Sequence, residues 1–284
     1  MKIGFIGGGN MAEALIKGLT EKGQDITRSS EVDTLVFQQA APLVFVQAGI
    51  LVSEPVSARC YYLKDHYHVT AMSDNITVLK ASDTIIIAIK PQNMPTLKEQ
   101  VQGIDFTGKT VMSIVAGIKL AALNAMFPGA FVVRVMPNTP ALVLEAMSVV
   151  TSDTSVPKEI LKKAEGIFSA IGQVVFLSED MMDAVTAVSG SGPAFFALFT
   201  KCVIEAGVAL GLPDDISSKL AIQTMTGTAK LLSSGQLPAE LIKMVASPGG
   251  TTEAGLKKFE ALGLKNIVSE ALQSAAHRSA ELGK

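Results

Sequence analysis

Three consecutive glycines near the start of the chain have the types and spacing of a dinucleotide-binding turn. The motif Gly7-x-Gly9-x-x-Ala12 follows an apolar, strand-like run over 2–6 and precedes apolar residues at helical spacing over 11–20. Gly7 permits a tight turn, Gly9 lets the backbone approach a pyrophosphate, and Ala12 lets the helix pack closely on the strand. Glycine-rich turns also occur for packing alone, but a strand before the turn and a helix after it favour a bound NAD or NADP.

A second glycine-rich turn lies far downstream, in the run Ser247-Pro248-Gly249-Gly250-Thr251-Thr252. Such a run entering a helix presents backbone N–H donors and two hydroxyls at the positive end of the helix dipole, which suits a small carboxylate. On spacing alone, an ordinary capped turn explains the same residues equally well.

The acid that binds the ribose hydroxyls of NAD is expected about 20 residues after the glycine turn, at the end of the second strand. Counting leads to Glu31 or Asp33, but neither follows a strand-like run. Glu54 does, because it ends the apolar run 49–53. We therefore place the adenosine side of the site at Glu54.

Three interpretations of Glu54 are open at this point. Its carboxylate would accept a hydrogen bond from a ribose 2′-OH and repel a 2′-phosphate, which favours NAD. Ser53 with Arg59 or Lys64 would instead bind that phosphate and favour NADP. The third interpretation is a solvated carboxylate at the end of a strand.

Two further loops follow strand-like runs, namely Ala88-Ile89-Lys90-Pro91-Gln92 and Val115-Ala116-Gly117. Ligands of open α/β sheets bind at the carboxyl ends of the strands, so we expect both loops to line the nicotinamide half of the cofactor. Lys90 is either positioned there or a surface cation.

The elements that must position these loops fall into two groups. Short apolar runs alternate with helical patterns over the first part of the chain, and the strand-like ones are 84–89, 111–115, 131–135 and 174–177. From residue 183, Ala-, Leu- and Met-rich stretches at helical spacing dominate, at 193–210, 214–233, 238–245 and 264–282. This predicts an α/β Rossmann-type doubly wound parallel sheet over 1–177, followed by an all-α domain over 178–284. The segment 25–48 fits neither pattern and is an extra hairpin, an extended helix or an insertion.

The composition narrows the partners and the compartment. A net charge of -2 gives no bulk field for nucleic acid or an anionic membrane, and no apolar run is long enough for a membrane span. Two cysteines are too few for a disulfide framework or a metal cluster, so we expect free thiols, no metal and a cytoplasmic location.

The chain resembles the pyrroline-5-carboxylate reductases over nearly its full length. The resemblance rests on five motifs in the right order: Phe5-Ile6-Gly7-x-Gly9-Asn10-Met11-Ala12, Ala88-x-Lys90-Pro91-Gln92, Val135-Met136-Pro137-Asn138-Thr139-Pro140, Ser189-Gly190-Ser191-Gly192-Pro193-Ala194 and Ser247–Thr252. Two features depart from the family: segment 25–48 is atypical, and Leu144 and Ala146 stand where the family often has glycine.

The resemblance implies reduction of (S)-1-pyrroline-5-carboxylate to L-proline, the last step of proline biosynthesis, with NADPH or NADH. It also implies a homodimer through the helical domain, often assembled into a homodecamer. Carried over to this chain, the cofactor residues are Ile6, Gly7, Gly8, Gly9, Asn10 and Met11 on the pyrophosphate, Glu54 and Asn75 on the adenosine side, and Ala88, Ile89, Lys90, Pro91, Ala116 and Gly117 on the nicotinamide side. The substrate residues are Glu179, Gly250, Thr251 and Thr252, and Thr252 is the catalytic residue, with its hydroxyl near the ring nitrogen.

Two rival functions are compatible with the glycine turn but fit the second half of the chain less well. Hydroxyacid dehydrogenases that join a Rossmann domain to a helical one usually place a catalytic Lys four residues after a glycine in the first long helix of the second domain. Here the fourth residue after Gly192 is Phe196, and Lys201 lies further on. A non-catalytic dinucleotide sensor has no need of the downstream Gly-Thr turn. Hydride transfer from a nicotinamide needs little side-chain chemistry, so the absence of histidine from every motif is no obstacle.

Overall fold

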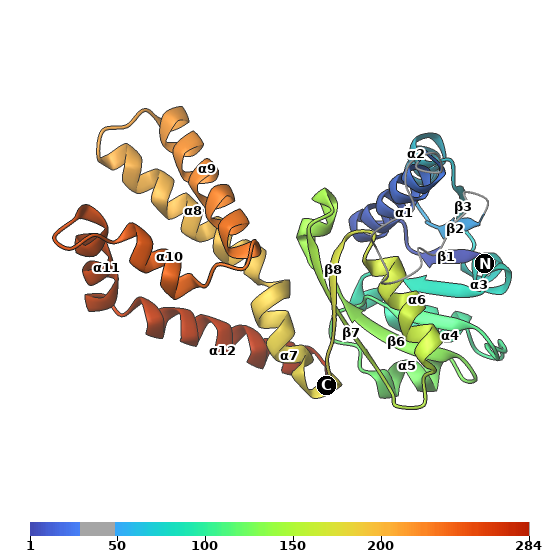
Figure 1. Ribbon diagram of the computed structural model, residues 1–284. Coiled ribbons are helices and arrows are strands. Elements are labelled where there is room, and N and C mark those ends of the chain that lie inside the picture. Colours follow the sequence, from blue (N-terminus) through green and yellow to red (C-terminus); the bar gives the residue numbers. More distant parts are fainter. Residues whose placement is uncertain (29–48, 284) are drawn as a thin grey trace, which may run out of the picture. The chain divides into compact units, whose positions relative to one another are not determined.

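The computed structural model describes residues 1–28 and 49–283 (Figure 1). The chain folds into two compact units, a sheet unit of Met1–Gly190 with Ala276–Lys284 and a helical unit of Ser191–Ala275. The sheet unit therefore extends beyond residue 177, where the sequence pattern changes. The reason is that Met182 and Val185 bury their side chains with Val149 of the sheet.

The sheet unit contains an eight-stranded sheet with the order β3-β2-β1-β4-β5-β6-β7-β8. Its order from β3 to β6 is that of a dinucleotide-binding Rossmann sheet, which confirms the predicted α/β class. The pairing of β6 with β7 is antiparallel, because residues 137–145 are too few for a parallel crossover. The strands are β1 (Ile3–Ile6), β2 (Ile50–Ser53), β3 (Thr70–Met72), β4 (Thr84–Ile87), β5 (Thr110–Ser113), β6 (Phe131–Met136), β7 (Ala146–Ser152) and β8 (Gly172–Phe176).

Helices cover both faces of this sheet, as a doubly wound fold requires (Figure 1). One core cluster takes side chains from α1, α2 and α6, and the other from α3, α4 and α5. Neighbouring residues of β1 point to opposite clusters: Phe5 belongs to the first and Ile6 to the second. The helices are α1 (Asn10–Arg28), α2 (Ser57–Tyr67), α3 (Asn75–Ala81), α4 (Met94–Gln100), α5 (Leu120–Met126), α6 (Lys158–Phe168) and α7 (Met182–Val185).

Among the described residues, short helical turns also occur: the 3-10 turns η1 (Pro91–Asn93), η2 (Thr139–Val143) and η3 (Glu179–Met181), and the π-turn η4 (Thr186–Gly190). Helix α1 continues to Arg28, so the first residues of segment 25–48 are helical. The remainder of that segment, with Glu31 and Asp33, lies outside the described residues.

The helical unit consists of α8 (Gly192–Ala209), α9 (Asp214–Ser233), α10 (Pro238–Val245), α11 (Thr251–Ala261) and most of α12 (Leu264–Leu282). Pro213 and Pro238 stand at the starts of α9 and α10, where a missing N–H costs no hydrogen bond. Much apolar surface of α8 is open to solvent, with Phe196 69% and Leu198 60% exposed. Within the described residues, the continuous helical stretch Glu179–Ala209 is long and apolar enough to cross a membrane by length and composition, and 11% of its most apolar window is buried. The expectation that no apolar stretch is long enough for a span therefore does not hold by this measure, which averages hydropathy over a helix that also contains polar residues.

Candidate active site

The turn that begins at Gly7 closes between the ends of three neighbouring strands. The Gly7 N–H donates to the Ser53 carbonyl at 2.8 Å, and the Ala88 N–H donates to the Ile6 carbonyl at 2.8 Å. Gly7 has φ +98°, and a Cβ added there would lie 2.7 Å from the Ala88 carbonyl oxygen. Both the backbone conformation and the space therefore require glycine at position 7.

The two following glycines differ in their surroundings. A Cβ at Gly8 would meet Leu63 Cδ1 at 2.8 Å, whereas one at Gly9 would meet no described atom within 4 Å. Gly9 and Asn10 are exposed, and the Glu13 N–H makes the first helical bond to the Gly9 carbonyl at 2.9 Å. The preceding N–H groups of α1 therefore have no acceptor within the helix. An open, side-chain-free face with free amides fits a diphosphate.

Glu54 lies directly beside this turn and is buried. Its exposed fraction is 9%, its Oε2 accepts from the Gly8 N–H at 2.9 Å, and its Oε1 accepts from the Val56 N–H at 3.0 Å. The interpretation of Glu54 as a solvated carboxylate is therefore wrong, because backbone amides hold both of its oxygens.

Asn75 also reaches the carboxyl end of β2. Its Oδ1 accepts from the Ser53 hydroxyl at 2.6 Å, and its amide donates to Gln100 at 2.7 Å. Asp74 caps α3, and hydrogen bonds from Thr77 and the Ile76 N–H lower the pKa of the Asp74 carboxyl. Glu54 and Asn75 thus flank the same strand end.

The loops expected on the nicotinamide side follow β4 and β5. Ala88 and Ile89 are half-buried, while Lys90 and Pro91 are exposed at the start of η1. Gly117 has φ +79°, and a Cβ there would lie 3.1 Å from the Leu282 carbonyl oxygen. The last residues of α12 therefore lie against the Gly117 loop.

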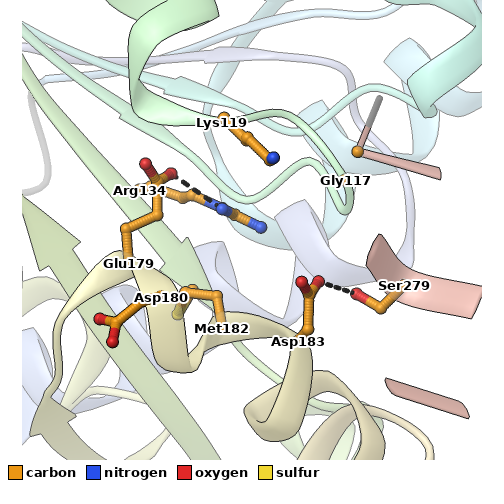
Figure 2. A pocket seen from close by; sticks show the side chains of 9 residues that line it. Gly117, Lys119, Arg134, Glu179, Asp180, Met182, Asp183 and Ser279 are labelled. Carbon is orange, nitrogen blue, oxygen red and sulfur yellow. Dashed lines mark hydrogen bonds and ion pairs between the residues drawn. The ribbon is translucent and has the colours of Figure 1, made fainter. Parts of the chain in front are cut away.

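A cavity of about 300 Å³ opens beside Gly117 in the sheet unit (Figure 2). Figure 2 shows the side chains of Lys119, Arg134 and Asp183 pointing into the same space. The cavity also brings Gly117 together with Glu179, which come from widely separated parts of the sequence. Its lining residues are Gly117, Lys119, Arg134, Glu179, Asp180, Met182, Asp183, Ser279 and Gly283.

Glu179 is held by the fold within this cavity. Its Oε1 accepts from Arg134 Nη1 at 2.9 Å and from the Leu120 N–H at 2.7 Å, and the Arg134 side chain is only 6% exposed. Asp183 Oδ1 accepts from the Ser279 hydroxyl at 2.7 Å. Sequence reasoning missed Arg134 and Asp183 as site residues, because their partners lie at distant positions and neither belongs to one of the five motifs.

The Gly-Thr turn of the helical unit is shaped by its own residues. Gly249 has φ +71° and its N–H donates to Glu253 Oε2 at 2.7 Å, while the Gly250 N–H donates to the Ser247 carbonyl at 3.0 Å. Hydrogen bonds from Gly249 and Lys257 lower the pKa of the Glu253 carboxyl.

Helix α11 begins directly after this turn, at Thr251. The Ala254 N–H makes the first helical bond, to the Gly250 carbonyl at 3.2 Å. The N–H groups of Thr251 and Thr252 therefore have no acceptor within the helix, as an anion site requires. Thr251 is exposed and Thr252 is half-buried.

A polar contact that the sequence did not predict links two of the family motifs. Asn138 Nδ2 lies 3.2 Å from both the carbonyl and the hydroxyl oxygen of Ser189, and Asn138 Oδ1 accepts from the Met147 N–H at 3.0 Å. The loop after β6 is thereby fixed to the π-turn. Both residues stand in motifs, but only the fold shows that they are partners.

The sheet order and the open glycine turn are those of a dinucleotide-binding fold, and the family matches place the chain among the NAD(P)H-dependent oxidoreductases. Residues 2–117 match the family model of coenzyme F420-dependent NADP oxidoreductases, and residues 179–282 match that of pyrroline-5-carboxylate reductase dimerisation. Together with the relatives described next, these matches show that the chain belongs to the pyrroline-5-carboxylate reductase family.

Full-length relatives carry the same name. A pyrroline-5-carboxylate reductase from Synechocystis is 38% identical over 285 residues, which cover 100% of this chain and 99% of the relative. The structure of such a reductase from Coxiella burnetii has a TM-score of 0.85 at 30% identity and covers 100% of this chain and 98% of its own. A Plasmodium falciparum pyrroline carboxylate reductase with NADP bound has a TM-score of 0.79 at 28% identity, with the same coverage.

Proposed function

We propose that this protein reduces (S)-1-pyrroline-5-carboxylate to L-proline with NADPH or NADH, the last step of proline biosynthesis. The observation that carries the proposal is the presence in one chain of an open dinucleotide turn at Gly7 and a second turn, at Gly250, suited to a carboxylate. Full-length relatives named for this activity support it. Hydride adds to C5 of the C=N bond, and the ring nitrogen gains or retains its proton.

The cofactor fits the carboxyl end of the sheet. The pyrophosphate would lie on the open face of Ile6–Met11, with the adenosine side near Glu54 and Asn75. The nicotinamide would lie along Ala88, Ile89, Lys90, Pro91, Ala116 and Gly117. When bound, the nicotinamide supplies the hydride, so the protein's task is orientation of the reacting atoms.

The substrate carboxylate would bind the backbone of Gly250 and Thr251 at the start of α11. The Thr251 N–H has no acceptor within the helix, whereas the Gly250 N–H would share its present bond to the Ser247 carbonyl with the ligand.

Thr252 would donate or relay a hydrogen bond to the ring nitrogen and so support the iminium. A hydroxyl is a weak acid, so Thr252 stabilises charge more than it transfers a proton. Glu179 would contribute to the substrate pocket through the cavity that it lines with Arg134.

We further propose that 1–177 form the cofactor domain and 178–284 the substrate and dimerisation domain, and that the chain acts as a homodimer or homodecamer. The exposed apolar face of α8 supports this, because a second copy would cover it. The match of residues 179–282 to a dimerisation model favours protein over lipid as the cover of Glu179–Ala209. Two free cysteines, Cys60 and Cys202, fit a reducing cytoplasm.

The function is tested by mixing the purified protein with pyrroline-5-carboxylate and either NADPH or NADH and following the absorbance of the reduced cofactor. We expect substrate-dependent oxidation of the cofactor and formation of proline by amino-acid analysis. Absence of turnover with both cofactors would contradict the proposal.

Light scattering at several protein concentrations tests the proposed assembly, and a monomer at all of these concentrations would contradict it.

A further inference from the structure

The backbone of Gly8, in the middle of the cofactor turn, is held from both sides by side chains of the β2–α2 region. Its N–H donates to Glu54 Oε2 at 2.9 Å, and its carbonyl accepts from Arg59 Nε at 2.7 Å. Glu54 and Arg59 thus fix the two peptide planes that meet at Gly8. We call this pair of contacts the Gly8 clamp.

Arg59 also contacts two other side chains, Glu13 and Tyr62. Its Nη2 pairs with Glu13 on α1, and its guanidinium lies 5.0 Å from the centre of the Tyr62 ring. Glu13 also accepts from the hydroxyls of Tyr62 at 2.9 Å and Tyr67 at 2.8 Å. The Arg59 charge is therefore neutralised next to the turn.

The Glu13 side of this network stays ionised. Partial burial raises the pKa of Glu13, but the hydrogen bonds from Arg59, Tyr67 and Tyr62 outweigh burial, so its pKa lies below the ordinary value. Burial and the hydrogen bond to Glu13 raise the pKa of Tyr67, which keeps its hydroxyl a donor. Arg59 is thereby locked between an anion and the Gly8 carbonyl.

We propose that Glu54 and Arg59 are positioning residues that hold the Gly8 backbone for the pyrophosphate of either dinucleotide, rather than ligands that tell NADH from NADPH. The chemistry of Glu54 fits: two backbone N–H groups, at Gly8 and Val56, need two acceptor atoms, and a carboxylate supplies both. This inference rests on the proposed use of a nicotinamide dinucleotide, but it concerns binding and not reduction.

The three roles give different results in one experiment, the titration of NADH and NADPH against variants by nucleotide fluorescence without substrate. A ribose ligand at Glu54 predicts that Glu54→Gln selectively improves NADPH binding. A phosphate ligand at Arg59 predicts that Arg59→Met selectively weakens NADPH binding. The Gly8 clamp predicts that each variant raises the dissociation constants of NADH and NADPH by about tenfold and leaves their ratio unchanged.

Arg59→Lys separates charge from geometry. Lysine keeps the positive charge, but its single ammonium cannot reproduce the guanidinium's two contacts with the Gly8 carbonyl and Glu13 in the same directions. The clamp predicts that Arg59→Lys weakens the binding of both cofactors nearly as much as Arg59→Met does. Retention of NADPH binding in Arg59→Lys would overturn the proposal.

The matched control is Lys17→Met, which removes a cation of α1 that pairs with Glu21 at the surface. It should leave both dissociation constants unchanged, and a loss equal to that of Arg59→Met would overturn the proposal. In the double variant Glu54→Gln/Arg59→Met, the loss of cofactor affinity should be smaller than the product of the two single losses, because both side chains act on the backbone of one residue. Full multiplicativity would contradict the clamp.

Steady-state kinetics complete the test. Because the clamp acts on cofactor binding, the KM for NADH should rise while kcat at saturating cofactor stays within about twofold. Thermal unfolding of each variant identifies any that do not fold, and variants of the partly exposed Arg59 keep the test available if Glu54→Gln unfolds. If the variants bind both cofactors more weakly in parallel but the wild type shows no reductase activity, the clamp stands and the proposed function is contradicted.

Discussion

The two glycine turns of this protein are built in opposite ways. The turn at Gly7–Gly9 is fixed by contacts with Ser53, Glu54 and Ala88, which lie far along the chain. The turn at Gly249–Gly250 is fixed by Ser247 and Glu253, which are its immediate neighbours. The first turn depends on the whole sheet, whereas the second depends on a few consecutive residues. The conformation of the cofactor turn is therefore set by long-range contacts, and that of the Gly-Thr turn by contacts within the turn.

The strongest test of this contrast is Gly7→Ala. The new Cβ would lie 2.7 Å from the Ala88 carbonyl in a backbone of positive φ, so the turn and the strand ends must move apart. We expect cofactor affinity to fall by about 100-fold or more. Fluorescence titration with NADH measures it, and an affinity near that of the wild type would mean that the turn is not rigid.

Gly9→Ala is the companion variant. A Cβ there meets no described atom within 4 Å, so the unfolding temperature should not change. Weaker cofactor binding in this variant would then result from a clash between the new Cβ and the cofactor, and not from a change in the protein.

Thr252→Ala tests the substrate half. Loss of the hydroxyl should lower kcat by about tenfold or more while the dissociation constant for NADH stays unchanged, because Thr252 lies in the first turn of α11 and not in the cofactor loop. Stopped-flow measurement of hydride transfer checks the chemical step. Unchanged turnover would remove Thr252 from the mechanism.

Gly249→Ala measures how tolerant the local turn is. Gly249 has φ +71°, but a Cβ there would meet no described atom within 4 Å, so only the backbone conformation opposes the change. We expect a cost of about 1–2 kcal/mol in the free energy of unfolding. A loss of activity as large as that caused by Gly7→Ala would break the contrast between the turns.

The pH dependence of stability should reveal the network behind the first turn. The pKa of Glu13 lies below its ordinary value of 4.5, so its contribution is complete above pH 4.5 and is lost as the pH falls through the folded-state pKa. Glu13→Gln should be less stable than the wild type at pH 7, and the difference should shrink below pH 4.5. Thermal unfolding across this range measures the effect, and a difference independent of pH would contradict it.

The smallest effect is expected at Leu144, where the family often has glycine. Leu144 has φ +62° and packs against a core cluster, so Leu144→Gly relieves a backbone cost and loses apolar contact together. The two contributions oppose each other, and we expect the free energy of unfolding to change by less than about 1 kcal/mol. Denaturant titration measures it, and a larger loss would show that packing dominates.

The sequence predicted what local patterns encode. The glycine turn, the strands β1, β4, β5 and β6, and the helices α9, α10 and α12 follow from spacing, apolar runs and proline positions. Strand β3 was missed because Thr70–Met72 is short and its apolar pattern is weak. Strand β7 was missed because its seven residues mix polar and apolar types without a clear period.

The site divides in the same way. Gly7 could be selected from spacing, because a tight turn between a strand and a helix requires its positive φ. The partners of Glu54, Arg134 and Glu179 could not, because a hydrogen bond between positions 8 and 54 or between 134 and 179 depends on strand order. Long-range pairing is thus where the structure adds most to the sequence.

The return of α12 to the sheet unit has a consequence for how this protein can be divided. The chain leaves the sheet unit after Gly190 and re-enters it at Ala276, so the helical unit is an insertion with two covalent connections. A single protease cut in either connection leaves each fragment with a piece of the sheet unit, so it does not separate one whole unit from the other. Simple C-terminal truncation removes Ser279 and Leu282, which contact Asp183 and the Gly117 loop. To isolate the sheet unit, the chain must be changed at both connections together, after Gly190 and before Ala276, so neither connection alone is a boundary between the units.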